Sequence, residues 1–320
     1  MAAELAGCTA LALALDCWLG DPRWLPHPVR GMGRACRWLE PVLVGALGRT
    51  RLAGVVLVLA IVGGSAALTW AALALAAGIS PWLHALLATA LLYTAFAARD
   101  LDVEARGISA ALDSADLPGA RRALSRIVGR DTEQLSSSEV VRGAVESVAE
   151  STLDGCLSPL FYALLGGPCA ALAFKAASTL DSMIGHRDEK YLHFGWAAAR
   201  LDDALGWLPA RLARGFFPLA AALCGLRARG SWRIAWRDGR RSPSPNAGIP
   251  EAATAGALGI QLGGVNTYHG EVQERPRLGD ALRPLEAADI GRAVELMYAT
   301  TGVALLCLIG ARLAAAGIFT

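Results

Sequence analysis

Three carboxylates in the middle of the chain have the spacing and chemistry of a metal or substrate site. Glu146, Glu150 and Asp154 follow one another at intervals of four residues, so a helix carries all three on one face. Like charges at this spacing destabilise an isolated helix by about 0.2–0.5 kcal/mol per pair. Carboxylates held close together suit Mg²⁺, which takes one or two of them together with substrate phosphate. The ladder therefore predicts metal or substrate binding, and a solvated helix face is the competing interpretation.

A second polar stretch follows the apolar segment that ends at Phe174. Its charged and imidazole side chains include Lys175, Asp181, His186, Arg187 and Lys190. Ionisable groups are costly inside a bilayer and usually mark function there. Their density beside membrane-grade hydrophobicity indicates a reaction site at a bilayer surface.

The N-terminal segment adds a third group of candidates. Asp16 lies near the end of an apolar helix, where a charge is costly unless it faces a polar cavity or a cation. The proline-rich loop that follows could bind a metal or a phosphate through Asp21, Arg23, His27 and Arg30. A membrane-surface turn with Trp anchors explains the same loop equally well.

A fourth group lies in a Pro- and Gly-rich region near the C-terminus. Four side chains there could orient an amide-rich ligand, namely Asn246, Glu251, Asn266 and Tyr268. The alternative is a structured loop with helix caps at Ser244 and Asn246.

The composition is that of a membrane protein. Hydrophobic residues make up 54% of the 320 residues and charged residues only 18%, against about a quarter in an ordinary soluble domain. Uncharged runs cover 52–77 and 79–98, and a spanning helix needs about 20 apolar residues. The formal net charge of +2 gives no sign of nucleic-acid binding. The seven cysteines include no C-x-x-C pair, so we interpret them as small buried hydrophobes.

These runs predict an all-α, polytopic integral membrane protein with about five to six membrane helices, folded as one domain over 1–320. The expected membrane segments are 3–19, 52–77, 79–98, 155–178, 207–226 and 294–318. The polar segments, expected on the cytoplasmic side, are 20–51, 99–154 and 227–293. Arginine-rich flanks place 20–51 and the segment after Arg99 inside. The turn at Gly78 and the N-terminus are then outside.

Local signals mark where two of these elements begin and break. Ser136 and Glu139 form a capping box that starts the carboxylate-bearing helix. Gly166-Gly167-Pro168 interrupts the next apolar segment, leaving halves too short to span singly. Either one kinked helix crosses, or a re-entrant helical hairpin returns to the same side. The hairpin is required if residues 131–154 and 181–203 serve one site.

The longest motifs together resemble one known family. They are LDCWLGDPRWLPHPVRGMGR at 15–34, RDTEQLSSSEVVRGAVESVAESTLDGCLSPLFYALLGG at 130–167, KAASTLDSMIGHRDEKYLHFGWAAARLDDALGWLPARL at 175–212 and SPNAGIPEAATAGALGIQLGGVNTYHGE at 244–271. In this order, and over nearly the whole chain, they resemble the adenosylcobinamide-phosphate synthase family of cobalamin biosynthesis, CobD/CbiB. Cys17 and the His186-Arg187 pair vary the pattern expected at those positions.

The resemblance implies a multi-pass enzyme of the cell (inner) membrane, with its active site on the cytoplasmic side. The implied ligase reaction joins adenosylcobyric acid to aminopropanol or aminopropanol O-phosphate, giving adenosylcobinamide or its phosphate. ATP as cosubstrate would activate the carboxylate, and Mg²⁺ would neutralise developing charge. The implied partners are the corrinoid, the amine, the lipid bilayer, and further copies of the chain or other cobalamin-pathway enzymes, but not nucleic acid.

The resemblance supports the positions of the candidates, and chemistry suggests their roles. Glu146, Glu150 and Asp154, together with Asp181, are the candidates for holding the metal. The catalytic candidates are His27, Lys175, Asp181, His186 and Lys190, where a histidine takes the proton of the attacking amine and lysines hold phosphate. The substrate-binding candidates are Asp16, Asp21, Arg23, Arg30, Arg187, Asn246, Glu251, Asn266 and Tyr268.

Two other classes of protein fit parts of the sequence. Broken helices with Asp16 and Lys175 inside the membrane are features of transporters. Against this class, polar residues cluster in long surface segments and no inverted repeat is visible. A membrane-bound scaffold could dock pathway enzymes through the arginine-rich segment 227–241. Formation of a product separates the enzyme from both.

Overall fold

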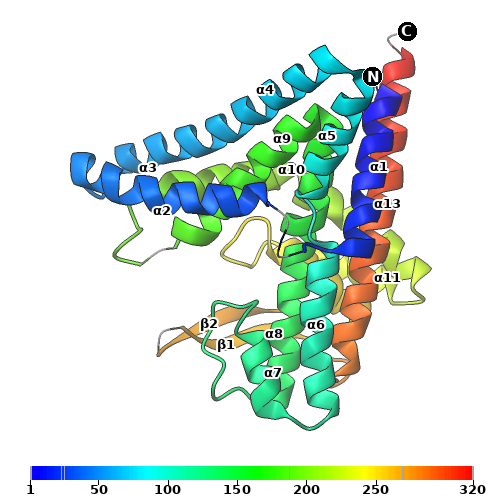
Figure 1. The fold of residues 1–320 in the computed structure, drawn as a ribbon. Helices are drawn as coiled ribbons and strands as arrows, with labels where there is room; N and C mark the ends of the chain where they lie inside the picture. The colour runs from blue at the N-terminus through cyan, green and yellow to red at the C-terminus, as the bar shows by residue number, and fades with distance from the viewer. Residues whose placement is uncertain (1, 23, 25, 187, 269, 319–320) are drawn as a thin grey trace. The chain divides into compact units, whose positions relative to one another are not determined.

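The fold is seen in a computed structural model that describes residues 2–22, 24, 26–186, 188–268 and 270–318. The predicted site residues Arg23 and Arg187 lie outside the described residues. Two compact units make up the chain: Met1–Ala97, Ser158–Gly206 and Cys307–Thr320 form the first, and Ala98–Leu157 and Trp207–Leu306 form the second. Figure 1 follows the elements along the sequence. This division does not decide whether the chain folds as one domain, so the expected single domain over 1–320 stays a prediction.

Long apolar helices make up the first unit. They are α1 (Ala2–Leu19), α2 (Pro28–Leu47), α3 (Arg51–Val58), α4 (Gly64–Ile79), α5 (Pro81–Tyr93) and α9 (Ser158–Ile184), with parts of α10 (Trp196–Leu223) and α13 (Ala288–Ile318). A π-helical turn at Leu59–Gly63 joins α3 to α4. α9 packs against α1, α2, α4 and α5, and α1 lies beside α5 (Figure 1). The core of this unit therefore forms around α9.

The turn between α4 and α5 lies at Ser80 and not at Gly78, which the sequence had suggested. Gly78 is still inside α4. Ser80 adopts an extended backbone, its hydroxyl accepts a hydrogen bond from the Trp82 amide at 3.2 Å, and Pro81 occupies the first turn of α5. Serine is a strong N-cap and proline needs no amide donor at this position. These two residues therefore end one helix and start the next.

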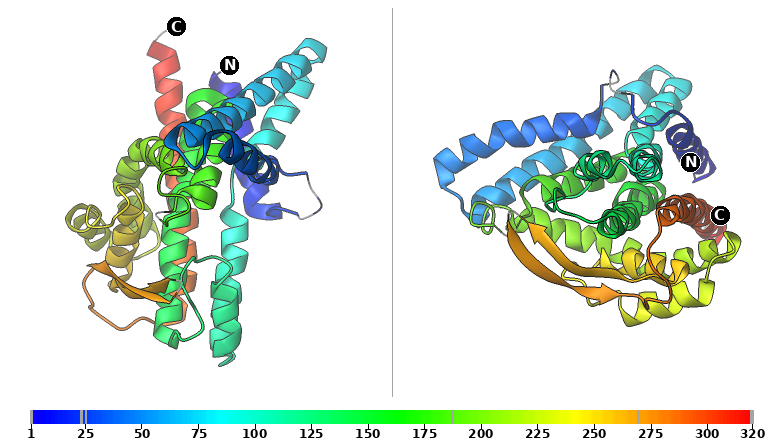
Figure 2. Two further views of the ribbon diagram at one scale, coloured as in Figure 1. Left: turned by 90° about the vertical axis from the view of Figure 1, so that its left-hand side faces the viewer. Right: turned by 90° about the horizontal axis from the view of Figure 1, so that it is seen from below.

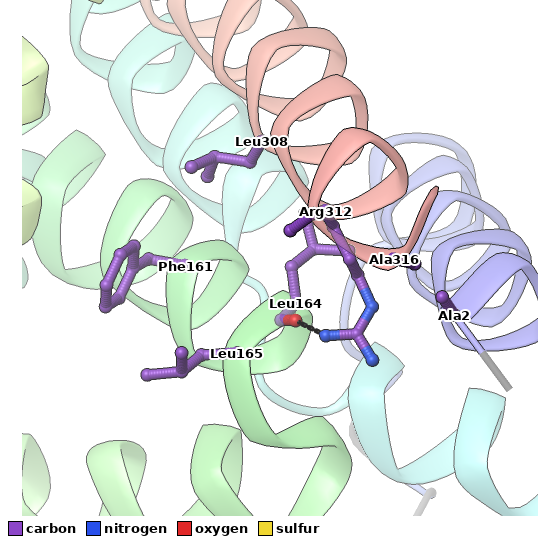
Figure 3. A pocket seen from close by; sticks show the side chains of 8 residues that line it. Ala2, Phe161, Leu164, Leu165, Leu308, Arg312 and Ala316 are labelled. Carbon is purple, nitrogen blue, oxygen red and sulfur yellow. Dashed lines mark hydrogen bonds between the residues drawn. The ribbon is translucent and has the colours of Figure 1, made fainter. Parts of the chain in front are cut away.

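α9 is broken at the glycine pair, as the sequence predicts. Gly167 has φ 68° and ψ −160°, a conformation outside the helix that is almost confined to glycine. Pro168 has no amide hydrogen, so the carbonyl of Leu164 loses its usual helical donor. A guanidinium nitrogen of Arg312 donates to that carbonyl instead (Figure 3). Both kinked-helix and re-entrant interpretations require this break, and the re-entrant path stays a prediction.

An apolar cavity of about 420 Å³ lies beside this break. Phe161, Leu165 and Leu308 line it together with Ala2 and the stem of Arg312 (Figure 3). Arg312 thus carries the polar contact of an otherwise apolar wall.

The second unit is assembled from shorter helices and a hairpin. Its elements are α6 (Ala98–Asp113), α7 (Leu117–Leu124), α8 (Ser137–Thr152), a π-helical turn (Leu153–Leu157), α11 (Ala228–Arg237), α12 (Gly248–Leu258), β1 (Leu262–Tyr268) and β2 (Glu271–Leu278), with the remaining parts of α10 and α13. α6, α7 and α8 pack on one another, and α12 packs on α8 and α11. α11 and α12 cross at Gly230 and Gly256, where a Cβ on either glycine would lie 2.4 Å from the other's carbonyl oxygen.

The two strands form an antiparallel hairpin that the all-α prediction omits (Figure 2). Val265 lies opposite Glu274 and Asn266 opposite Gln273, with a shift of register between Leu262 and Gly264. The uncharged stretch over 252–264 contains the end of α12 and the start of β1. The prediction of a mainly helical chain is otherwise confirmed.

Within the described residues, five helical stretches are long and apolar enough to cross a membrane. They are Ala2–Leu19, Arg51–Ile79, Pro81–Asp113, Ser137–Ile184 and Ala288–Gly317. The chain is therefore a multi-pass membrane protein. In the same described part of the chain, α10, which includes all but the last three residues of the expected segment 207–226, is not among these stretches. A crossing at 207–226 stays a prediction.

Candidate functional site

Two of the three ladder carboxylates, Glu146 and Glu150, lie on α8, and Asp154 lies in the π-helical turn that follows it. α8 begins with the predicted capping box: the Ser136 hydroxyl accepts from the Glu139 amide at 3.4 Å, and the Glu139 carboxylate accepts from the Ser136 amide at 2.8 Å. Every residue over 140–149 is buried, whereas Glu150 is exposed. The solvated-face interpretation is therefore wrong for Glu146, which is 6% exposed.

A network of arginine, glutamate and asparagine joins α8 to the hairpin. Arg130 pairs with Glu146 and also donates to the Asn266 side-chain oxygen at 2.9 Å. Arg142 donates to the same oxygen at 3.0 Å and to the Val265 carbonyl at 2.8 Å. Two guanidinium groups thus converge on one amide oxygen of β1, and charge-assisted hydrogen bonds of this kind are the strong ones.

Glu146 closes the network from the opposite side. One of its carboxylate oxygens accepts from Arg130, and the other accepts from the Gly263 amide at 2.7 Å. Gly263 has φ 78°, and a Cβ there would lie 2.1 Å from the Pro276 carbonyl oxygen. Only glycine fits this bend of the hairpin, and the bend presents the amide to Glu146.

Glu251 brings a further carboxylate from α12 to the same place. Burial raises the pKa of Glu251 well above its usual range, and the neighbouring charges of Glu150 and Glu146 raise it further. Arg275 and Arg130 oppose this effect without cancelling it. Glu251 is thus a carboxyl group that retains a proton at higher pH than an ordinary glutamate, and a cation bound beside it and Glu150 would displace that proton.

Two buried donors in this network have no hydrogen-bond partner among the described residues. They are Nε of Arg142 and Nδ2 of Asn266, whose residues are 8% and 3% exposed. Buried donors are rarely left without an acceptor. A ligand with carbonyl, carboxylate or phosphate oxygens would supply one.

The donor set fits a metal ion only in part. In the described part of the chain, no three His, Cys, Asp or Glu side chains gather as a metal site. Both oxygens of Glu146 already bind protein groups. Asp154 does not continue the regular spacing of α8, because it lies in the π-helical turn that begins at Leu153. Glu150 and Glu251 remain as two neighbouring acids, the number that Mg²⁺ commonly takes together with phosphate. Ligation by Glu146, Glu150 and Asp154 stays a prediction.

The N-terminal candidates form a separate group in the first unit. Asp21 lies 3.5 Å from Nε2 of His27 and 3.6 Å from Arg30. Asp16 is buried near the end of α1, with 2% of its surface exposed. The loop therefore brings three of its predicted residues together.

The candidates after the break of α9 occupy its last turns and the loop beyond. Lys175 and Asp181 are partly buried, and His186 is exposed. The backbone of Gly185 packs against the Asp181 side chain, and a Cβ on Gly185 would lie 1.9 Å from the Asp181 carboxylate. Lys190 lies 3.6 Å from Glu40. A hydrogen bond to the Tyr191 hydroxyl and the charge of Glu40 raise the pKa of Lys190, so it is a cation and not a base.

Asn246, the remaining candidate from the Pro- and Gly-rich region, contacts an arginine of α10. Its side-chain oxygen accepts from Arg211 at 2.7 Å. The Ser244 hydroxyl accepts from the amides of Asn246 and Ala247 at 3.3 and 3.2 Å. Ser244 therefore stabilises the turn before α12, but neither Ser244 nor Asn246 is its helix cap, because the N-cap position is Ala247.

Comparison with known proteins agrees with this arrangement of motifs. A profile described as CobD/Cbib protein matches residues 9–297. A protein of Geobacter metallireducens named cobalamin biosynthesis protein CobD is 50% identical over 294 residues, which cover 92% of each chain. The chain belongs to the CobD/CbiB family. The CobD of Klebsiella pneumoniae is 44% identical over 96% of this chain and 97% of its own length. The CbiB of Salmonella typhimurium is 42% identical over 98% and 99%. No solved structure matches.

Three residues of this CobD/CbiB chain belong to the site but were given no role from sequence. Arg130 and Arg142 bind Glu146 and Asn266, and the Arg275 guanidinium lies 5.4 Å from the centre of the Tyr268 ring. Arg142 precedes Glu146 by one helical turn, which is a readable signal. The positions of Arg130 and Arg275 depend on contacts between distant segments and leave no local pattern.

Proposed function

We propose that this CobD/CbiB protein acts in cobalamin biosynthesis as an amide-forming ligase. It would join a carboxylate of adenosylcobyric acid to aminopropanol or aminopropanol O-phosphate and give adenosylcobinamide or its phosphate. The observation that carries the proposal is the buried cluster of Glu146, Arg130, Arg142 and Asn266 with Glu251 beside it. The names of the relatives, cobalamin biosynthesis proteins, supply the class of substrate.

The two open donors define how the substrate could be held. Nε of Arg142 and Nδ2 of Asn266 would donate to amide or carboxylate oxygens of the corrinoid. Both side chains are fixed through their remaining polar atoms, so little conformational freedom is lost on binding. Tyr268 would provide an aromatic face nearby.

Activation of the carboxylate requires a leaving group, and we infer ATP as its source. Phosphoryl transfer to the carboxylate oxygen gives an acyl phosphate and ADP. The neutral amine nitrogen then attacks the acyl carbon, phosphate leaves, and the nitrogen loses one proton. Bound Mg²⁺ would supply neutralisation of the phosphate charge. We assign Glu150 and Glu251 as its protein ligands, beside the predicted Glu146 and Asp154.

The remaining candidates act on protons and phosphates. His27 or His186 would accept the proton of the amine. Lys175, Lys190 and Arg187 would hold phosphate, since each is a cation that can donate several hydrogen bonds. Asp181 would orient one of these groups. We place the reaction at the cytoplasmic face of the inner membrane.

A product assay tests the proposal. Detergent-purified protein is mixed with adenosylcobyric acid, aminopropanol phosphate, Mg²⁺ and ATP, and with ATP omitted in parallel. A product whose mass equals the two substrates minus water supports the ligase, and its absence without ATP supports the activation route. Glu251→Gln should lower the rate at least tenfold because it removes one of the assigned metal ligands, with exposed Glu274→Gln as control. Substrate flux into liposomes without product would instead indicate a transporter, and neither flux nor product a scaffold.

A further inference from the structure

A buried arginine on α10 has guanidinium nitrogens without a partner. Arg214 is only 4% exposed. Its Nε and Nη2 atoms make no hydrogen bond to any described residue. A buried charge left without hydrogen bonds or an opposite charge is strongly unfavourable. The site is therefore incomplete as protein alone.

Two further arginines, Arg211 and Arg240, lie near enough to Arg214 for the like charges to repel one another. Burial lowers the pKa of Arg214, and the nearby charge of Arg240 lowers it further. Burial likewise lowers the pKa of Arg211, followed by the charges of Arg214 and Arg240. Among the described residues, no carboxylate forms an ion pair with any of the three.

The surrounding groups hold two of these arginines in place. The Arg214 guanidinium lies 4.4 Å from the centre of the Trp236 ring, and that of Arg211 lies 4.6 Å from the Trp207 ring. Arg211 also donates to the Asn246 side chain at 2.7 Å and to the Trp207 carbonyl at 3.1 Å. Stacking on indole rings fixes the guanidinium planes and leaves their edges able to bind an anion.

We propose that Arg211, Arg214 and Arg240 form a binding site for a phosphate group, outside the Glu146 network. Three guanidinium groups match the charge and the several acceptor oxygens of a phosphate mono- or diester. The ligand could be a soluble phosphate compound or the headgroup of an anionic phospholipid, which share this chemistry. Asn246 would contribute by holding Arg211 and not by touching corrinoid amides.

The test compares binding and stability in the full-length protein. Thermal unfolding is followed in detergent with increasing inorganic phosphate, against chloride at equal ionic strength. Retention of phosphatidylglycerol and phosphatidylcholine is compared by native mass spectrometry. Saturable stabilisation by phosphate supports a soluble ligand, and selective retention of phosphatidylglycerol supports a headgroup. The absence of both overturns the proposal.

Variants identify the residues. Arg214→Gln should weaken binding by about tenfold or more, as expected for loss of charge-assisted hydrogen bonds. It should also raise the Tm without ligand, because it removes a buried unpaired charge. Arg240 is exposed, so Arg240→Gln should weaken phosphate binding without altering folding. If Arg214→Gln does not fold, the binding measured with Arg240→Gln tests the proposed site. Arg229→Gln, exposed on α11, is the control. Wild-type binding by both Arg214→Gln and Arg240→Gln overturns the proposal.

Discussion

At the scale of single residues, the site depends on charges that are buried together. Glu146 and Arg130 have side chains that are only 8% and 9% exposed. Breaking a buried pair is costly because the remaining charge has no partner, whereas an exposed pair contributes little. Stability at this position is therefore tied to the same groups that would bind substrate.

Replacing Arg130 by Met should lower the free energy of unfolding by about 3–5 kcal/mol, because Glu146 stays buried without its counter-charge. Adding Glu146→Gln should restore a large part of that loss. The control is Arg126→Met, since Arg126 pairs with Glu104 on the surface at 2.7 Å, and a loss of about 0–1 kcal/mol is expected. Denaturant unfolding in detergent measures all four proteins. Equal losses in both single variants would refute the buried-pair argument.

Glu251→Gln should stabilise the protein at high pH and not at low pH. The fold raises the pKa of Glu251 above the ordinary 4.5, so the folded state binds a proton more tightly than the unfolded state. Stability then falls as pH rises above that value, and below it both states are protonated. We expect the variant to have a Tm a few degrees higher at pH 8 and an unchanged Tm near pH 4. Glu274→Gln should show no such pH dependence, and an equal effect at both pH values would contradict the argument.

At the scale of elements, the break in α9 requires one particular backbone. Gly167 adopts φ 68° and ψ −160°, and Arg312 replaces the donor that Pro168 lacks. The break could be predicted from sequence because glycine and proline impose it locally. The hydrogen bond from Arg312 could not be predicted, because 148 residues separate Arg312 from Leu164.

Gly167→Ala should destabilise the protein by about 1–3 kcal/mol, because an L-residue is strained in that conformation. Gly63→Ala is a matched control: its backbone is helical with φ −65°, and a Cβ there meets no atom within 4 Å. It should be neutral or stabilising by up to about 1 kcal/mol. Thermal unfolding in detergent compares the two. A neutral Gly167→Ala would show that the break is not needed.

The capping box of α8 could be predicted from sequence, whereas the hairpin and the position of Glu251 could not. Ser136 and Glu139 form their capping box because both partners lie within one helical turn. The hairpin escaped prediction because Gly263 and Gly264 interrupt β1 and Pro276 lies in β2. Such residues weaken a strand pattern. The convergence of Glu251 with Glu150 depends on packing of α12 on α8, which no periodicity specifies.

At the scale of the whole molecule, topology decides which groups face one compartment. The expected arrangement puts the α4–α5 turn outside and residues 131–154 and 181–203 inside. The re-entrant path of α9 is one way to bring both segments to the same side.

Cysteine labelling tests this topology. In a background with the seven native cysteines replaced, Lys190→Cys should react with an impermeant maleimide only from the cytoplasmic side. Gly78→Cys, exposed near the end of α4, should react only from the outside. Labelling of position 190 from the outer face would exclude the re-entrant path as proposed.

Asn266 accepts a hydrogen bond from Arg130 and the Gly263 amide donates one to Glu146, so β1 is tied to the groups proposed to bind the ligand. Small hairpins open readily by themselves, so anything bound to those groups should slow the exchange of their amide hydrogens with deuterium. The exchange rates of the β1 and β2 amides would then report how much of the protein has ligand bound. Corrinoid binding could be read from them by mass spectrometry even when no chemical turnover takes place.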